Sequence, residues 1–150
     1  MQLMRRMLMG AAAAVVLRAG ARAAEIVSPV PGKRVALQGY DPVAYFTDGR
    51  PILGDAHIWY EFDDTVYIFA TTDHRAAFVG DPDHFAPQFR GFCTISVSEG
   101  GKDEGLAQYW KIVDGTLFVF GKDFGPDMFA KDPTGIMAKA RANWASLKSQ

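Results

Sequence analysis

A single cysteine, Cys93, constrains how this chain can be stabilised. One cysteine cannot form an internal disulfide, so the fold must depend on its hydrophobic core alone. The chain contains 11 phenylalanines, 5 tyrosines and 3 tryptophans, and all of them follow residue 23. Large rings contribute much buried area per residue. We therefore expect a domain that is built around an aromatic core.

The first 23 residues have the layout of a bacterial export signal. Arg5 and Arg6 precede an apolar run at residues 7–17, and small residues at 21–23 supply a cleavage site. The run is 11 residues long, which is shorter than the roughly 20 that cross a bilayer. The arginine pair suggests twin-arginine translocation, and ordinary secretion stays open as the alternative. The mature protein is expected to be periplasmic or secreted, without stable insertion in a membrane.

Cleavage after residue 23 would change the charge of the chain. The signal contains four arginines and no acidic residue, so the formal net charge would move from −1 to −5. We expect no nucleic-acid partner, because a negatively charged protein is not attracted to a polyanion. The remaining 127 residues suffice for one domain. We assign residues 24–38 to an extended entry segment and residues 39–148 to the folded domain, and no internal repeat is apparent.

Capping, turn and periodicity signals predict an α+β fold. The expected elements are a helix begun by Asp41-Pro42 and ended by Gly49, a hairpin within residues 57–71 around the turn at 63–65, a helix within 72–80 capped by Thr72 or Asp73, a strand at 92–97, a hairpin within 109–120 around Asp114-Gly115, and a helix begun by Asp132-Pro133. They predict a small single domain in which a mainly antiparallel sheet of about five short strands, with two hairpins, is packed by short helices and a C-terminal helix.

Cys93 lies in the segment FCTISV, where alternation places it on the same side as Ile95 and Val97. The simplest interpretation is a buried small hydrophobic residue, since free cysteine is among the most buried residue types. A second interpretation makes its thiol reactive, with Arg90 as the nearby positive charge in the sequence. Both interpretations stay open.

A third interpretation makes Cys93 a ligand of a soft metal ion or of haem iron. His84 lies nine residues earlier across a proline-flanked loop, and His57 begins a predicted strand, so either imidazole could approach the sulfur. Cys93, His84 and His57 are therefore the candidate metal ligands, with copper, iron, zinc or haem as the candidate cofactor. Methionine does not suggest a copper site, because only Met128 and Met137 follow the signal and both are expected in the core.

Aromatic residues supply candidates for a ligand pocket. Tyr40, Tyr45, Phe92 and Trp110 could line one, and core packing is the ordinary alternative for rings at strand spacing. The sequence contains no nucleophile elbow, no phosphate-binding glycine loop and no helix with paired acidic residues at ligand spacing. It therefore favours a binding role over an enzyme, and it indicates no catalytic residue.

Four blocks of sequence, taken together and in this order, resemble the exported YHS domain-containing proteins of bacteria. The blocks are GYDPVAYF at residues 39–46, YIFATTDHRAAFVGDPDHFAPQFRGFC at 67–93, WKIVDGTLFVF at 110–120 and AKARANW at 138–144. The resemblance covers about residues 35–145, nearly the whole expected mature chain. It implies a small domain of undefined activity, with metal binding as the usual suggestion, because YHS domains also occur beside heavy-metal and copper transport ATPases and in some oxygenase components.

Three functions are compatible with this sequence. The first is a periplasmic binding module that holds or transfers a metal ion or metal cofactor, although metal-associated YHS segments tend to contain more than one cysteine. The second is a metal-free interaction domain that docks on a membrane transporter or a periplasmic oxidoreductase. The third is a thiol-dependent enzyme that uses Cys93.

Overall fold

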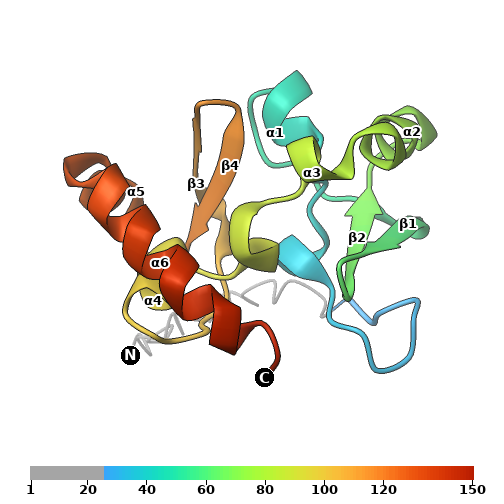
Figure 1. Ribbon diagram of the computed structural model, residues 1–150. Coiled ribbons are helices and arrows are strands. Elements are labelled where there is room, and N and C mark those ends of the chain that lie inside the picture. The colour runs from blue at the N-terminus through green and yellow to red at the C-terminus, as the bar shows by residue number, and fades with distance from the viewer. Residues whose placement is uncertain (1–25) are drawn as a thin grey trace, which may run out of the picture.

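The computed structural model describes residues 26–150 (Figure 1). The predicted export signal at residues 1–23 lies outside this part of the chain. Across the described residues, no helix is long and apolar enough to cross a membrane. In chain order, with η for a short turn of 3-10 type, the elements are η1 (Ala36–Gly39), α1 (Ala44–Thr47), β1 (Asp55–Phe62), β2 (Thr65–Phe69), α2 (Thr72–Gly80), α3 (Pro82–Phe85), η2 (Gln88–Gly91), α4 (Thr94–Ser98), β3 (Leu106–Val113), β4 (Thr116–Phe120), α5 (Gly125–Lys131) and α6 (Pro133–Leu147).

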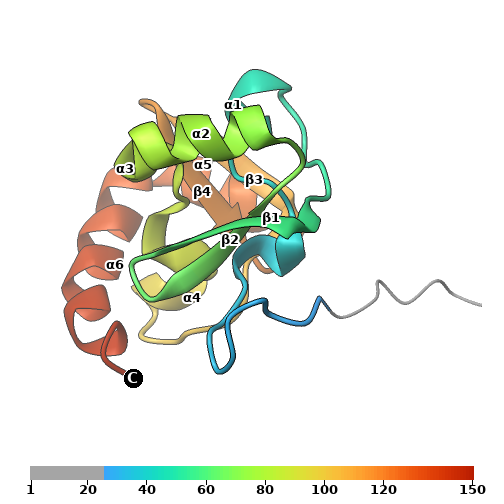
Figure 2. The ribbon, with the colours of Figure 1, turned by 90° about the vertical axis from the view of Figure 1, so that its right-hand side faces the viewer.

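The α+β prediction is confirmed, with four strands in the described residues where about five were expected. β1 pairs with β2 and β3 pairs with β4, both antiparallel, and the two hairpins form separate two-stranded sheets. Figure 2 shows α2 lying alongside the β1–β2 hairpin, and Figure 1 shows α4 and α6 together on the opposite side of the molecule. Both predicted hairpin turns and the long C-terminal helix are confirmed.

The predicted strand at residues 92–97 is wrong, because most of this segment forms helix α4. The N–H of Val97 donates to the carbonyl of Cys93 at 2.9 Å, which is the bond of a helical turn. All of residues 92–97 are buried. The alternation of residue types therefore did not mark one buried face and one exposed face.

The two hairpins repeat one another at a distance of 51 residues. Both contain an irregularity in the strand register, and it falls at the same place in each. The cross-strand pairs that flank the irregularity are Asp55–Phe69 and Trp59–Ile68 in the first hairpin, and Leu106–Phe120 and Trp110–Val119 in the second. The expectation that the chain has no internal repeat is therefore wrong.

The repeat extends upstream of each hairpin to η1 and η2. The N–H of Gly54 donates to the carbonyl of Gly39 at 2.9 Å, and the N–H of Gly105 donates to the carbonyl of Gly91 at 3.1 Å. Gly39 and Gly91 have φ values of 81° and 80°, in the left-handed region that favours glycine. The same turn therefore meets the start of the same hairpin twice.

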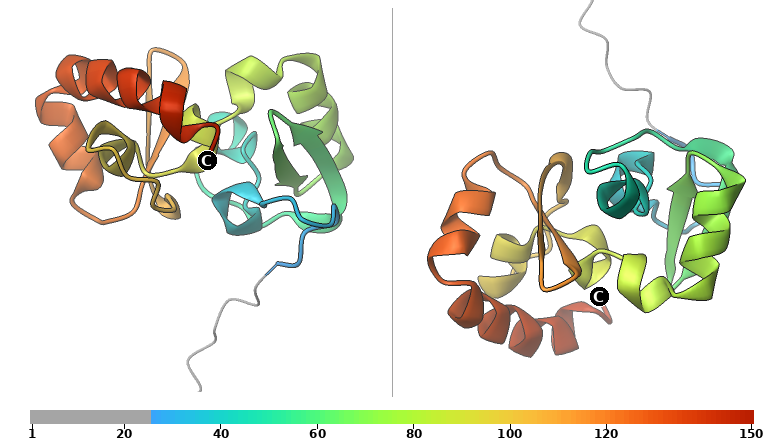
Figure 3. Two further views of the ribbon diagram at one scale, coloured as in Figure 1. Left: turned by 60° about the horizontal axis from the view of Figure 1, so that its bottom comes forward. Right: turned by 90° about the horizontal axis from the view of Figure 1, so that it is seen from above.

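The repeat also extends downstream of each hairpin. Asp81 and Asp132 have nearly equal backbone angles, with φ and ψ of −152° and 71° for the first and −150° and 65° for the second. Each caps a helix that a proline begins. We call residues 36–85 the first half and residues 88–147 the second half, and Figure 3 shows the two halves side by side.

Each half contains a cluster of buried rings. In the first, the centroids of Phe69 and Phe78 lie 5.1 Å apart. The corresponding rings of the second, Phe120 and Phe129, lie 5.6 Å apart. We call the cluster around Phe78 the first core and the cluster around Phe129 the second core.

Strand β4 belongs to both cores. Leu117 and Val119 pack in the first core, whereas Phe118 and Phe120 pack in the second. These residues alternate along the strand, so its two faces point to different cores. The first half therefore completes its core with side chains from the second half.

Two smaller expectations differ from the structure. The hydroxyl of Thr71, rather than a side chain at position 72 or 73, caps α2 by accepting from the N–H of His74 at 3.1 Å. Met128 is 40% exposed on α5, whereas Met137 packs in the second core as expected.

Candidate functional site

The structure separates the three predicted metal ligands. Cys93 lies in the second core and is 7% exposed. His84 packs against the rings of Phe46 and Phe85 in the first half, and His57 is an exposed residue of β1. Within residues 26–150, no group of three or more histidine, cysteine, aspartate or glutamate side chains could hold a metal ion. The placement of these residues therefore gives the metal prediction no support.

The four predicted pocket residues are divided between the two cores. Tyr45 is buried in the first core, where its ring meets Trp110 edge to face at 5.1 Å. Tyr40 packs against the same core. Phe92 belongs to the second core and lies under the guanidinium of Arg34 at 3.9 Å. The four rings therefore pack in two clusters rather than around one common pocket.

Cys93 occupies the position that Asp41 has in the first half. The N–H of Asp41 donates to the carbonyl of Ile52 at 2.8 Å, and the N–H of Cys93 donates to the carbonyl of Asp103 at the same distance. Each residue directly follows one that forms an isolated β-bridge to the segment before its hairpin. Tyr40 pairs with Leu53, and Phe92 pairs with Glu104. The lone cysteine is thus the counterpart of a buried carboxylate.

The carboxylate of Asp41 is fully buried and joins three elements of the first half. It accepts from the N–H of Val43 at 2.8 Å, from the N–H of Ala70 at 2.8 Å and from Nδ1 of His74 at 2.6 Å. Nε2 of the same imidazole lies 3.3 Å from the hydroxyl of Thr47. A buried carboxylate needs such partners to be tolerated, so we interpret this cluster as structural. The sequence indicated Asp41 only as a helix cap, and no motif spacing indicated His74.

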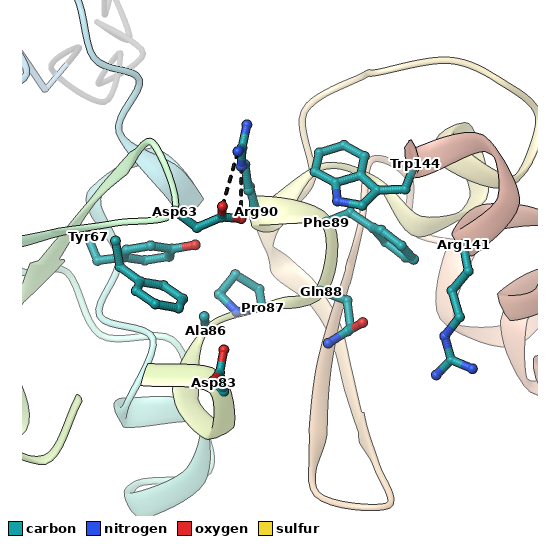
Figure 4. A pocket seen from close by; sticks show the side chains of 11 residues that line it. Asp63, Tyr67, Asp83, Ala86, Pro87, Gln88, Phe89, Arg90, Arg141 and Trp144 are labelled. Carbon is teal, nitrogen blue, oxygen red and sulfur yellow. Dashed lines mark hydrogen bonds and ion pairs between the residues drawn. The ribbon is translucent and has the colours of Figure 1, made fainter. Parts of the chain in front are cut away.

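A cleft of about 250 Å³ lies between the two halves (Figure 4). Residues of the β1–β2 turn and of α3 line it from the first half, and residues of α6 line it from the second. The segment at 86–90, which joins the halves, lies between these two sides. No part of the sequence analysis pointed to this place, because its lining comes from four separate segments.

Trp144 supplies aromatic surface to the cleft. Its half-buried ring lies 5.6 Å from the ring of Phe89 and 5.8 Å from the guanidinium carbon of Arg90. Contacts of this kind hold an indole in place by edge-to-face packing and by cation–π attraction. The indole is therefore a preformed wall of the cleft.

An ion-pair network holds two lining residues of the cleft, Asp63 and Arg90, in place. The guanidinium of Arg90 donates to both carboxylate oxygens of Asp63, at 3.1 and 3.2 Å, and Nζ of Lys148 lies 2.9 Å from the same carboxylate. The hydrogen bonds from Arg90, aided by Lys148, hold the pKa of Asp63 below its usual range. This network ties the turn of the first hairpin to the second half.

Arg90, which forms this network, and its neighbour Phe89 both have a left-handed backbone. Phe89 and Arg90 have φ values of 55° and 56°, which costs a non-glycine residue roughly 1–2 kcal/mol. Leu37 and Gln38 have nearly the same conformation in the first half. The strain therefore belongs to the repeated turn, and in the second half it places Arg90 against Asp63.

Two charged side chains of the cleft have no partner among the described residues. Asp83 on α3 and Arg141 on α6 are both exposed, and neither forms an ion pair or a side-chain hydrogen bond within residues 26–150. They come from opposite halves, and Figure 4 shows Gln88 between them. As far as residues 26–150 are concerned, the cleft thus presents one carboxylate and one guanidinium that are available to a ligand.

A second cavity, of about 310 Å³, lies at the repeated position of the second half. Arg141 lines both cavities. Five residues of the second cavity lie 51 positions after residues that line the first cavity. They are Val113, Asp114, Phe118, Thr134 and Met137. The cleft between the halves is therefore one of two hollows that the repeat creates.

The side chains that line the cleft supply groups that can bind a ligand. Among the described residues that line it, there is no cysteine, serine, threonine, histidine or lysine. Burial raises the pKa of the one lining phenol, Tyr67, which keeps its hydroxyl protonated. The remaining groups can stack on a ligand, pair with its charges or donate hydrogen bonds.

Comparison with known proteins found no matching family model, no matching curated protein and no matching solved structure. The resemblance to YHS domain-containing proteins thus stays an expectation from the sequence.

Proposed function

We propose that this protein is an exported, YHS-like binding module that holds a small organic ligand in the cleft between its two halves. The observation that carries the proposal is the pair of unpartnered charges, Asp83 and Arg141, on opposite sides of a cleft with a fixed aromatic wall. Ligand sites occur preferentially at such junctions between structural units. The periplasmic address is part of this proposal and rests on the sequence alone.

Two other functions have less support from the described residues. Metal binding would need ligands that the structure keeps apart, since Cys93 and His84 lie in different clusters. A thiol-dependent enzyme would need an accessible cysteine, and Cys93 is 7% exposed. Both are proposals that direct measurements of metal content and thiol reactivity can test.

The ligand proposal can be tested through the emission of Trp144. In a Trp59→Phe/Trp110→Phe variant, Trp144 is the remaining tryptophan, so a change in emission reports on the cleft. We expect at least one compound from a panel of amino acids, peptides, sugars, nucleotides and organic acids to change this emission saturably and to raise the melting temperature. No change with any compound at millimolar concentration would overturn the proposal.

A metal-free docking domain is the second candidate, and one observation favours it. Phe124 is 54% exposed and Met128 is 40% exposed, one helical turn apart at α5. The residues 51 positions earlier are Asp73 and Ala77, so the apolar pair is specific to the second half. Exposed apolar groups of this kind mark interaction surfaces. A Phe124→Ser/Met128→Ser variant should lose capture of a transporter or oxidoreductase from periplasmic extract while keeping its fold.

A further inference from the structure

We infer that the ligand of the cleft is a short peptide with a free amino end and a free carboxyl end. This inference rests on the function proposed above, because it names the ligand class for the same cleft. Three features of the lining support it. They are the charges of Asp83 and Arg141, the aromatic wall formed by Trp144, and the amide of Gln88 between the two charges.

The charges of the cleft call for a ligand that carries both signs. Arg90, Lys148 and Asp63 already pair with one another, so Arg141 and Asp83 are the lining charges without a partner among the described residues. That leaves Arg141 to pair with a carboxylate and Asp83 to pair with an ammonium group. An anion alone would leave Asp83 unpaired, and a cation alone would leave Arg141 unpaired.

The placement of these charges on opposite halves favours a peptide over a single amino acid. Asp83 and Arg141 come from different halves, and the side chain of Gln88 lies between them (Figure 4). Each residue of an extended chain adds roughly 3.5 Å between its ends, whereas a single amino acid holds both charges on one carbon. The amide of Gln88 can donate to and accept from a peptide group, which has one carbonyl and one N–H.

The size and wall of the cleft fit a short peptide that carries one aromatic side chain. Its volume of about 250 Å³ is below the roughly 300–1,000 Å³ of sites for drug-sized ligands. Trp144, on the same helix as Arg141, supplies an aromatic wall on which a ring of the ligand can stack. A dipeptide that ends in an aromatic residue meets these conditions.

The test uses four probes: L-alanyl-L-phenylalanine, its N-acetyl derivative, its C-terminal amide and free L-phenylalanine. Each is titrated into the full mature chain by calorimetry, and into the Trp59→Phe/Trp110→Phe variant by emission of Trp144. We expect the free dipeptide to bind at least tenfold more tightly than each of the other three. Equal affinity for all four probes would overturn the inference.

Two substitutions assign the ends of the ligand. Arg141→Gln should abolish the preference for the carboxylate over the amide, and Asp83→Asn should abolish the preference for the free amino end over the acetylated end. Lys139→Gln, on the same helix, and Asp73→Asn, on α2, are exposed controls outside the lining and should keep both preferences. Retention of both preferences in the Arg141 and Asp83 variants would overturn the assignment.

The peptide inference and the proposed binding function can be disproved separately. If a sugar, nucleotide or organic acid binds and changes the emission of Trp144 while no peptide does, the peptide inference is wrong and the binding function stands. If no compound changes that emission, both are wrong.

Discussion

Asp63 and Asp114 occupy the same hairpin turn in the two halves but differ in their partners. Their φ values are 48° and 50°, so the backbone is nearly the same. Asp63 pairs with Arg90 and Lys148, whereas Asp114 forms no ion pair with another residue of the described chain. The repeat thus provides a matched pair of carboxylates, one with and one without a charge network.

This pair predicts a pH dependence of stability. Arg90 lowers the pKa of Asp63 in the folded protein, so the stabilisation is fully present above the unfolded value of about 3.9 and is lost as pH falls through the folded value. Asp63→Asn should lower the free energy of unfolding by about 1 kcal/mol at pH 7, and the difference from the parent should shrink below pH ~4. Urea unfolding between pH 2.5 and 7 measures it.

Asp114→Asn is the control for this experiment. Asparagine tolerates the left-handed conformation of both turns, so the backbone effect of the two substitutions is matched. We expect a smaller loss of stability at pH 7, because Asp114 has no ion-pair partner within residues 26–150. A pH profile shared by both variants would contradict the assigned network.

The burial of Cys93 predicts an unreactive thiol. Because its side chain lies in the second core, a thiol reagent should label the folded protein at least about tenfold more slowly than the unfolded protein. Met128→Cys in a Cys93→Ala background places a thiol at a 40% exposed position and should react rapidly in the folded state. Equal labelling rates for folded wild-type protein and this variant would show that Cys93 is accessible.

At the scale of elements, Asp41 holds α1, the end of β2 and α2 together. Asp41→Ala leaves two N–H groups and an imidazole without their acceptor, which should lower the free energy of unfolding by roughly 3 kcal/mol. Cys93→Ala, at the repeated position, removes one packed sulfur and should cost about 1 kcal/mol. Chemical denaturation of both variants measures the difference, and equal losses would contradict the structural role of Asp41.

Turn and capping signals in the sequence predicted both hairpins and the C-terminal helix. Turn residues at 63–65 and at Asp114-Gly115 located both hairpins, and Asp132-Pro133 located the start of α6. The sequence did not predict α4, because a short segment buried on all sides has no polar face to reveal its period. Local signals also could not reveal the cleft, whose lining is brought together only by the packing of the two halves.

The repeat is not apparent in the sequence for a related reason. Glycine, aspartate, proline and aromatic residues recur at turns and core positions, as in Gly54 and Gly105 or Phe78 and Phe129. Between these recurring positions the residue types differ. The two halves also end in helices of different length, because α3 has 4 residues and α6 has 15. Strand register preserves the repeat because hydrogen bonding and burial constrain the backbone more tightly than they constrain residue type.

At the scale of the whole molecule, the two halves are repeated in structure but not independent in energy. Leu117 and Val119 of the second half complete the first core. Asp63 of the first half pairs with Arg90 of the second half. The cleft depends on this arrangement, since neither half forms it alone. Separation of the halves would therefore expose core surface and remove the cleft together.

This coupling predicts one cooperative unfolding transition for the mature chain. Phe78→Ala and Phe129→Ala remove equivalent rings, 0% and 1% exposed, from the first and the second core, and each should cost roughly 3–5 kcal/mol. Because β4 belongs to both cores, each substitution should shift the whole transition rather than half of it. Calorimetry tests this through the ratio of calorimetric to van't Hoff enthalpy, which should stay near one in both variants. Two resolved transitions in either variant, with one near the wild-type temperature, would mean that the halves are separate folding units and that the cleft lies at a hinge.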